Sequence, residues 1–351
     1  MNALVTTLEK TINKETTLSL PTELKAALPL SAKLAQQISE HRQTVQNILD
    51  GKDKRLMVIT GPCSIHDPIA VLEYAEKLLE LQAQVSDQIF LVMRAYIEKP
   101  RTTVGWKGFL YDPNLDGSAN MQLGLEKSRQ LYLQLIEMGL PIASEILSPM
   151  ATAYFDDLLT WGAIGARTSE SQIHREISSH MPFSIGFKNG TDGSIQIALD
   201  AIQSASNEHQ FLGISQSGLP SLIESKGNPH AHLILRGSNT GANFSLAEIE
   251  KIKQKTKGEL PALVIDCSHG NSAKNPLNQP EVLQTIVAER LNSNVRGVML
   301  ESHLVDGNQK ISCNMTYGQS ITDGCLGWEK TAQLLNDVAE NLRCNEIKLS
   351  A

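Results

Sequence analysis

The chain has 351 residues, of which 41% are hydrophobic, and a formal net charge of -7. This length and composition suit one large α/β domain with its own core better than several small domains. No apolar run approaches the length of a membrane span, and the N-terminal segment MNALVTTLEKTINKE lacks the apolar stretch of a signal peptide. We therefore expect a soluble, cytoplasmic protein.

Charge and cysteine content exclude two further classes. Basic residues are spread along the chain rather than clustered with aromatic residues, and the isoelectric point is near 5.8, so no nucleic-acid partner is expected. The five cysteines are an odd number without the dense spacing of a disulfide scaffold. Free thiols in a reducing compartment are the default for such a chain.

The N-terminal region, residues 1–53, reads as an extension that precedes the main domain. Pro21 and Pro29 break any long helix within residues 1–30, so this part is predicted to be irregular. A helix then begins after Ser31, a good N-cap, and ends at Gly51. Its apolar positions follow helical spacing: Leu34, Ile38, Val45, Ile48 and Leu49. We expect the extension to make oligomer and regulatory contacts.

From residue 54 to residue 351 the pattern alternates between strands and helices. Helical segments, such as residues 69–84 and 280–292, lie between several short apolar or β-branched runs. Eight such runs predict a parallel (β/α)8 barrel, also called a TIM barrel, with the helices outside. The runs are residues 55–61, 89–96, 141–146, 162–167, 183–190, 232–237, 262–270 and 296–303.

A ninth candidate lies at about residues 211–225. Each of the eight runs delivers a charged or metal-binding group at its C-terminal end, where barrel enzymes place their chemistry, whereas the ninth delivers only Ser, Gln and Gly. Its Gly218-Leu219-Pro220 sequence favours a turn. We therefore predict an inserted β-hairpin at this point rather than a barrel strand.

Four potential metal ligands lie at the ends of predicted barrel strands: Cys63, His269, Glu301 and Asp323. A thiolate, an imidazole and two carboxylates suit a divalent transition metal better than magnesium or calcium. Each residue has a simpler alternative. A lone cysteine is usually a buried small hydrophobe, His269 fits a loop histidine of the same kind as His66, His174 and His303, and the two carboxylates fit helix caps.

A cationic set accompanies these ligands, although the chain as a whole is acidic. Its members are Arg94, Lys99, Arg101, Arg167, Lys188 and Arg236. Such groups bind phosphates and carboxylates, but individual arginines at a barrel rim are often structural ion-pair residues instead. The segment WGAIGAR lacks the G-x-G-x-x-G pattern of a dinucleotide site, so we exclude NAD.

Several long motifs resemble one enzyme family. GPCSIHDP, MRAYIEKPRTTVGWKG, WGAIGARTSESQIHRE, GFKNGTDGS, VIDCSHGNS, ESHLVDGNQ and YGQSITDGCLGWE occur in this order between residues 54 and 328. They resemble the signature segments of type I 3-deoxy-D-arabino-heptulosonate 7-phosphate (DAHP) synthase. A string of long motifs is far more specific than a short pattern. The resemblance implies a (β/α)8 barrel with an N-terminal extension, and an aldol-type transferase at the start of the shikimate pathway to aromatic amino acids.

The resemblance also implies ligands and roles. The substrates would be phosphoenolpyruvate and erythrose 4-phosphate, the cofactor a divalent metal (Mn, Fe, Co or Zn), the assembly a homodimer or homotetramer, and the inhibitor an aromatic amino acid. Cys63, His269, Glu301 and Asp323 would hold the metal, with Lys99 between the substrates as proton donor. The phosphoenolpyruvate pocket would comprise Arg94, Lys99, Glu145, Ala166 (through its backbone), Arg167, Lys188 and Arg236, and the erythrose 4-phosphate site Arg101 and Thr102.

The chain departs from the family pattern in two places. It reads RGSNTGANF from Arg236 to Phe244, one residue longer than is common and without a proline. The segment SSHMPFSIGF, residues 178–187, also differs, where the inhibitor pocket is expected. The effector therefore stays open among phenylalanine, tyrosine and tryptophan.

Two alternatives and one redox hypothesis remain. A 3-deoxy-octulosonate 8-phosphate synthase has the same barrel, but KPRTTVGWKG and the N-terminal extension argue against it. A non-catalytic phosphate-binding barrel would be expected to have lost ligands, yet all four and Lys99 are present. Because Cys325 lies two residues beyond Asp323, one hypothesis places it near Cys63 on a tight loop, with a disulfide between them in the metal-free protein. The alternative is that Cys325 is packed under the final helix.

Overall fold

The computed structural model describes residues 15–290 and 293–350. Predictions that fall on residues 1–14 lie outside the described residues. The central feature is a barrel of parallel strands in which β1 pairs with both β2 and β10, so that the sheet closes on itself. The barrel strands are β1 (Leu56–Gly61), β2 (Ile89–Arg94), β3 (Ile142–Glu145), β4 (Trp161–Ile164), β5 (Ser184–Lys188), β8 (His232–Leu235), β9 (Leu263–Asp266) and β10 (Val295–His303). All eight predicted strands and the (β/α)8 fold are confirmed.

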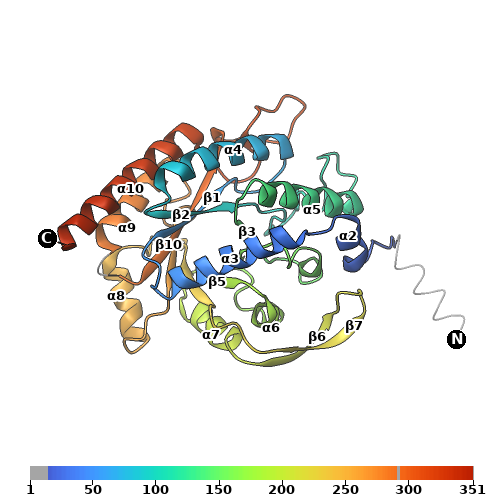
Figure 1. The fold of residues 1–351 in the computed structure, drawn as a ribbon, viewed down its shortest axis with the longest axis horizontal. Coiled ribbons are helices and arrows are strands. Elements are labelled where there is room, and N and C mark those ends of the chain that lie inside the picture. Colours follow the sequence, from blue (N-terminus) through green and yellow to red (C-terminus); the bar gives the residue numbers. More distant parts are fainter. Residues whose placement is uncertain (1–14, 291–292, 351) are drawn as a thin grey trace, which may run out of the picture.

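Helices cover the outside of the barrel, as Figure 1 shows. They are α4 (Pro68–Val85), α5 (Met121–Glu137), α6 (Gln172–His180), α7 (Gln196–Ala205), α8 (Leu246–Lys255), α9 (Gln279–Glu289) and α10 (Trp328–Ser350). Between β3 and β4 the connection carries only a short 3-10 helix, Thr152–Tyr154. The helix predicted over residues 280–292 is α9, which starts one residue earlier and ends at Glu289.

Two apolar clusters hold the barrel together. One lies between the strands and the outer helices. The other fills the barrel interior with side chains such as Met57, Val92 and Trp161, and it includes Val45 and Ile48 of helix α3 (Ala32–Leu49). Helix α3 therefore packs against the amino ends of the strands and closes that end of the barrel (Figure 1). The opposite end, where the strands finish, stays available for chemistry.

The N-terminal extension agrees with the sequence at α3 and differs from it before α3. The Ser31 side chain accepts a hydrogen bond from the Leu34 backbone N–H, and Gly51 follows the helix with φ +73°, as the capping pattern predicts. Residues 1–30, however, are not irregular throughout, because α2 (Pro21–Ala27) is helical. Pro21 is the first residue of this helix, where its missing N–H costs nothing, so it starts a helix rather than breaking one.

The ninth candidate segment forms a separate antiparallel hairpin, β6 (His209–Ile214) with β7 (Pro220–Ser225), as predicted. Gly218 lies in its turn with φ +75°. The hairpin projects beside α6 and away from the barrel strands (Figure 1). The Thr22 N–H of α2 donates to the Gln216 carbonyl of the hairpin turn at 3.2 Å, which ties the N-terminal extension to it.

Short strands follow β10. Strands β11 (Val305–Asn308) and β12 (Gln319–Ser320) form a small sheet, and β13 (Leu326–Gly327) pairs with the end of β10. Asp323 therefore does not follow a barrel strand, as the sequence suggested, but lies between β12 and β13, in a segment that returns to the strand ends. Within residues 15–290 and 293–350, no helix has the length and apolar character needed to cross a bilayer.

Candidate active site at the carboxyl ends of the barrel strands

A cavity of about 650 Å³ opens at the carboxyl ends of the strands. Groups from many strand ends and from the segments that follow them line it. All the residues that the sequence suggests for substrate contact are among them: Arg94, Lys99, Arg101, Thr102, Glu145, Ala166, Arg167, Lys188 and Arg236. His269, Glu301 and Asp323 line it as well. Cys63 is fully buried directly beneath this lining.

Three of the four suggested metal ligands converge on one point. One ligand atom each of Cys63, Glu301 and Asp323 lies within 4.8 Å of the other two. The β1–β10 register explains part of this, because Gly61 is paired with Glu301 and Cys63 follows two residues later. Glu301 lies in a strand rather than at a helix end, so its cap alternative is wrong. His269 lines the same cavity but does not belong to this three-residue group.

Lys99 lies at the centre of the anionic cluster. Its Nζ atom donates to Cys63 Sγ at 2.9 Å and to Asp323 Oδ2 at 2.7 Å. Burial alone would lower the pKa of Lys99, but the Cys63 sulfur and the carboxylates of Asp323 and Glu301 raise it well above its usual value. Lys99 is therefore held as an ammonium ion.

Burial and charge act differently on the Cys63 thiol and the Asp323 carboxyl. Burial, together with the Glu301 charge, raises the pKa of Cys63 to about 11. Burial would also raise the pKa of Asp323, yet the Lys99 ammonium holds it well below its usual range. The Cys63 proton is thus retained at neutral pH unless a stronger positive charge replaces Lys99 at the sulfur.

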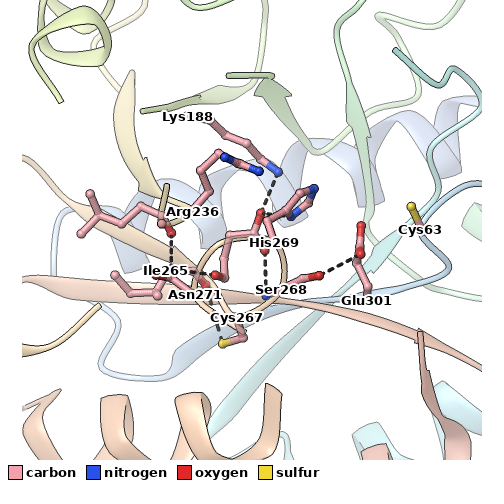
Figure 2. A network of polar contacts seen from close by, with 12 residues as sticks. Cys63, Lys188, Arg236, Ile265, Cys267, Ser268, His269, Asn271 and Glu301 are labelled. Atoms are coloured by element: carbon pink, nitrogen blue, oxygen red, sulfur yellow. Dashed lines mark hydrogen bonds and ion pairs between the residues drawn. The ribbon is translucent and has the colours of Figure 1, made fainter. Parts of the chain in front are cut away.

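Two buried ion pairs each join the ends of two strands that have one strand between them in the barrel. Arg94 donates to Glu301 Oε1 at 3.1 Å, and Lys188 donates to Asp266 Oδ2 at 2.8 Å. The same Asp266 oxygen lies 3.0 Å from His269 Nδ1, and Figure 2 shows His269 and Lys188 beside each other. The Ser268 hydroxyl donates to the other Glu301 oxygen at 2.9 Å (Figure 2). Arg94 and Lys188 therefore have structural partners and also face the cavity.

Other cations lie around the cavity without a carboxylate partner among the described ion pairs, namely Arg101, Arg167, Arg236 and Lys274. Burial lowers the pKa of the Arg236 guanidinium, and the neighbouring positive charge of Arg167 also lowers it. Two neighbouring cations on the wall of one cavity favour binding of a multivalent anion. Arg101 and Thr102 are exposed and lie on a different segment.

A network of asparagines fixes the backbone at Arg236. Asn189 Oδ1 accepts from the Arg236 N–H at 2.8 Å, and Asn243 Oδ1 accepts from the Gly237 N–H at 2.7 Å. Asn271, shown in Figure 2, accepts from the Asn243 N–H at 2.9 Å. The departure RGSNTGANF therefore extends the loop beyond Arg236 and returns it to a buried anchor at Asn243.

The sequence reasoning missed three residues of this site: Tyr96, Asp266 and Lys274. Asp266 and Lys274 lie just before and just after the CSHGNS motif, and Tyr96 follows Arg94 in MRAY. Their position beside these motifs is the sequence signal that could have identified them.

Cys325 approaches Cys63, in agreement with one of the two hypotheses for it. The Cys63 N–H donates to Cys325 Sγ at 3.4 Å, both residues are thiols, and the disulfide stays a prediction.

Comparison with known proteins gives the family. The model of the DAHP synthetase I family matches residues 31–336. The chain belongs to this family. It is 46% identical to "Phospho-2-dehydro-3-deoxyheptonate aldolase, Tyr-sensitive" of Salmonella typhimurium over 94% of this chain and 95% of the relative. It is 43% identical to the "phenylalanine-inhibited" Saccharomyces cerevisiae protein, over 93% of this chain and 91% of that one.

A solved structure agrees with this assignment. The phospho-2-dehydro-3-deoxyheptonate aldolase of Francisella tularensis SCHU S4 superposes with a TM-score of 0.92 at 45% identity, covering 95% of this chain and 98% of that chain. These similarities do not favour the octulosonate synthase or the non-catalytic barrel. In this DAHP synthetase family member, the cavity at the strand ends is therefore the candidate active site.

Glu98, which precedes Lys99, gives a prediction for stability against pH. Burial raises the pKa of Glu98 to about 7, although Ser148 N–H and Tyr111 O–H contact its carboxyl oxygens. The folded state thus keeps a proton that the unfolded chain releases near pH 4.5, and the stability falls as pH rises from about 4.5 to about 7. We expect Glu98→Gln to remove this loss and to increase stability at pH 8 by up to about 3 kcal/mol.

Thermal melts of both proteins between pH 5 and pH 8 measure this effect. Glu76→Gln, at an exposed position of α4, is the matched control. We expect it to change neither the midpoint of thermal unfolding nor the dependence of that midpoint on pH. If wild type and Glu98→Gln lose stability in parallel as pH rises, Glu98 is not the group responsible.

Proposed function

We propose that this protein condenses phosphoenolpyruvate with D-erythrose 4-phosphate to give DAHP and inorganic phosphate, as a 3-deoxy-7-phosphoheptulonate synthase of the cytoplasm. The observation that carries the proposal is that one cavity brings together a Cys–Glu–Asp donor set and separate groups of cations without an ion-pair partner among the described residues. Membership of the DAHP synthetase I family and the names of the relatives support it. The reaction needs an activated aldehyde and two anions held in register, and the cavity offers groups for both tasks.

A divalent transition metal fits the donor set. The three donor atoms are close enough to share one ion, and they include a sulfur, which favours Mn, Fe, Co or Zn over an all-oxygen cation. A cation, the Lys99 ammonium, already contacts two of the three donors. We place the metal at Cys63, Glu301 and Asp323. When bound, it would supply Lewis-acid polarisation of the aldehyde carbonyl.

His269 is the proposed fourth ligand. Its Nδ1 atom lies 3.0 Å from the Asp266 carboxylate, so Nε2 is the nitrogen left for a metal. A carboxylate behind a ligating histidine orients the ring and increases its basicity. This pairing supports His269 as a ligand even though it lies outside the tight three-residue group.

The basic residues divide between the two substrates. We assign Arg94 and Lys188, with Lys99, to the phosphoenolpyruvate carboxylate, and Arg167 and Arg236, with the Ala166 backbone, to its phosphate. Glu145 lines the same pocket. The positive charges of the neighbouring Arg167 and Arg236 side chains support a phosphate site in this part of the cavity.

The aldehyde substrate takes the outer part of the cavity. Arg101 and Thr102 are assigned to the phosphate of erythrose 4-phosphate because they lie on an exposed segment separate from the first cluster. Carbon 3 of phosphoenolpyruvate adds to the aldehyde carbon, and Lys99 donates a proton to the oxygen that becomes a hydroxyl. Water adds to carbon 2, and phosphate leaves with cleavage of its carbon–oxygen bond. The raised pKa of Lys99 keeps this group protonated at neutral pH.

An aromatic amino acid is the proposed inhibitor and a homodimer or homotetramer the proposed assembly. Relatives named Tyr-sensitive and phenylalanine-inhibited support the first part. The regulatory segment, residues 178–187, contacts the hairpin, because Ser179 Oγ lies 2.6 Å from Ser225 Oγ. Helix α2 contacts the same hairpin. We propose that residues 1–53 contribute to the oligomer and regulatory contacts.

An assay of the condensation tests the function. Metal-reconstituted protein mixed with phosphoenolpyruvate and erythrose 4-phosphate is expected to release phosphate and form DAHP, with at least one of phenylalanine, tyrosine and tryptophan slowing the initial rate. Arabinose 5-phosphate in place of erythrose 4-phosphate is expected to give little product. Equal or higher rates with arabinose 5-phosphate would show that the aldehyde has been assigned wrongly.

The metal assignment predicts the result of Cys63→Ser. A hydroxyl is a poor substitute for a thiolate on a transition metal, so the variant is expected to fold normally, bind metal at least tenfold more weakly and lose most activity. Metal content after dialysis and circular dichroism measure these properties. Cys267→Ser, at a buried cysteine outside the donor set, is the control and is expected to keep its metal. Near-normal metal content in Cys63→Ser would contradict the assignment.

The division of the cations predicts two different kinetic defects. Arg101→Ala is expected to raise KM mainly for erythrose 4-phosphate, and Arg167→Ala mainly for phosphoenolpyruvate, each by about tenfold or more, because each removes one charge-assisted contact to a different anion. Initial rates with each substrate varied in turn measure the effect. The two variants serve as controls for each other, and a defect toward the same substrate in both would show that the division is wrong.

A further inference from the structure

One tyrosine of the chain differs from the other five. Tyr96 is 3% exposed, and its hydroxyl oxygen has no hydrogen-bond partner. The hydroxyls of the remaining tyrosines each contact a protein group: Tyr74 with Thr60, Tyr111 with Glu98, Tyr132 with Ala95, Tyr154 with Ser19 and Tyr317 with Glu73. All six lie within the described residues. A buried hydroxyl without a partner is rare and destabilising, so it points to a group that is absent from the free protein.

The position of Tyr96 indicates where that group lies. Tyr96 lines the cavity at the strand ends. Among the buried side-chain atoms without a hydrogen bond in the described part of the chain, only Tyr96 Oη and His269 Nδ1 belong to residues that line this cavity, and His269 Nδ1 has the Asp266 carboxylate at 3.0 Å. Among the described residues that line this cavity, the Tyr96 hydroxyl is thus the one buried side-chain atom with neither a hydrogen bond nor an ion-pair contact.

The ring of Tyr96 is held in place by its surroundings. The Arg94 guanidinium carbon lies 3.7 Å from the ring centroid, in cation–π contact. The rest of the ring packs in the barrel-interior cluster with Val92, Ala143 and Trp161. The backbone is fixed as well, because the Tyr96 carbonyl accepts from the Ile65 N–H at 2.8 Å. Such a ring cannot easily turn to find another partner, so the hydroxyl is preorganised.

The charge around Tyr96 decides which role the hydroxyl takes. Burial raises the pKa of this phenol far above its usual value, and the carboxylates of Glu145, Asp266 and Glu301 add to the effect, against the opposing charge of Arg94. The phenol is therefore neutral and able to donate its proton in a hydrogen bond. The neighbouring Arg94 is assigned to a substrate carboxylate, so a substrate bound there brings its own oxygens, or water beside it, to this part of the cavity.

We propose that the Tyr96 hydroxyl is a further catalytic group, which donates a hydrogen bond to an oxygen of bound phosphoenolpyruvate or of the water that adds to its carbon 2. This inference rests on the proposed function, because it takes phosphoenolpyruvate as the ligand beside Arg94. No proton is transferred in this role. The phenol takes its partner from the ligand, which explains why the free protein leaves it without one.

Tyr96→Phe tests the proposal, since it removes one oxygen and keeps the ring beneath Arg94. In the metal-loaded full-length protein, we expect kcat/KM for phosphoenolpyruvate to fall about tenfold, the magnitude of one lost hydrogen bond to a charged or reacting group. The midpoint of thermal unfolding is expected to stay the same or to rise, because the variant removes an unsatisfied buried atom. Loss of activity without loss of stability is the signature that a merely structural hydroxyl would not give.

Tyr132→Phe is the matched control. Tyr132 is also fully buried, and its substitution removes the same single oxygen. Its hydroxyl, however, donates to the Ala95 carbonyl at 2.7 Å and lies 3.1 Å from Ser144 Oγ. Tyr132 does not line the cavity at the strand ends. We expect the opposite pattern in this variant: a melting midpoint lowered by a few degrees, with kcat/KM within about twofold of wild type.

Titration calorimetry of phosphoenolpyruvate separates the two acceptors. A raised Kd with unchanged kcat supports a bond to phosphoenolpyruvate, and a lowered kcat with unchanged Kd supports a bond to the attacking water. Tyr96→Phe with both kcat and Kd within about twofold of wild type overturns the proposal, as does an activity loss with a parallel fall in melting midpoint. Failure of the proposed function is distinguishable, because the wild-type protein would then release no phosphate from the substrate pair.

Discussion

The parallel pairing of β1 with β10 is the constraint on which the rest of the site depends. It closes the sheet and aligns Gly61 with Glu301, so the residues that follow the first strand lie next to the carboxylate of the last one. Cys63 reaches Glu301 and Asp323 through this register, although more than 200 positions separate it from each of them in the sequence. If the β1–β10 register shifted by one residue, the Glu301 side chain would point to the opposite face of the sheet. Glu301 would then no longer lie beside Cys63 and Asp323.

Charge balance within the closed barrel follows from the same geometry. The carboxylates of Asp266 and Glu301 are almost fully buried, and each is paired with a cation from the next strand but one, Lys188 and Arg94 respectively. Buried charges are tolerated only when they are paired in this way. The cations beyond these pairs, such as Arg167 and Arg236, line the cavity without an ion-pair partner among the described residues, and they are the groups that we propose for the anionic substrates.

The Tyr96 hydroxyl and the Lys99 ammonium illustrate two ways of preparing such a site. Lys99 is fully engaged with Cys63 and Asp323, so ligands must rearrange its contacts. Tyr96 is held rigidly with its hydroxyl free, so a ligand gains a hydrogen bond without breaking one. Only the Tyr96 arrangement therefore places the cost of preorganisation on the folded protein rather than on the bound state, which is the usual compromise between stability and activity.

The sequence by itself determined the eight strands, the helix after Ser31 and the hairpin. It also determined the motifs that bear Cys63, His269, Glu301 and Asp323. These features were accessible because apolar periodicity, capping residues and long motifs are local signals. It misjudged Pro21, since a proline both breaks and begins helices. It left Tyr96, Asp266 and Lys274 unassigned, because an unsatisfied hydroxyl, a shared carboxylate or a pocket lining exists only between segments far apart in the chain. The tertiary structure alone decided which basic residues form ion pairs, as Arg94 and Lys188 do. The reason is that strand register and barrel closure set the distances between charges.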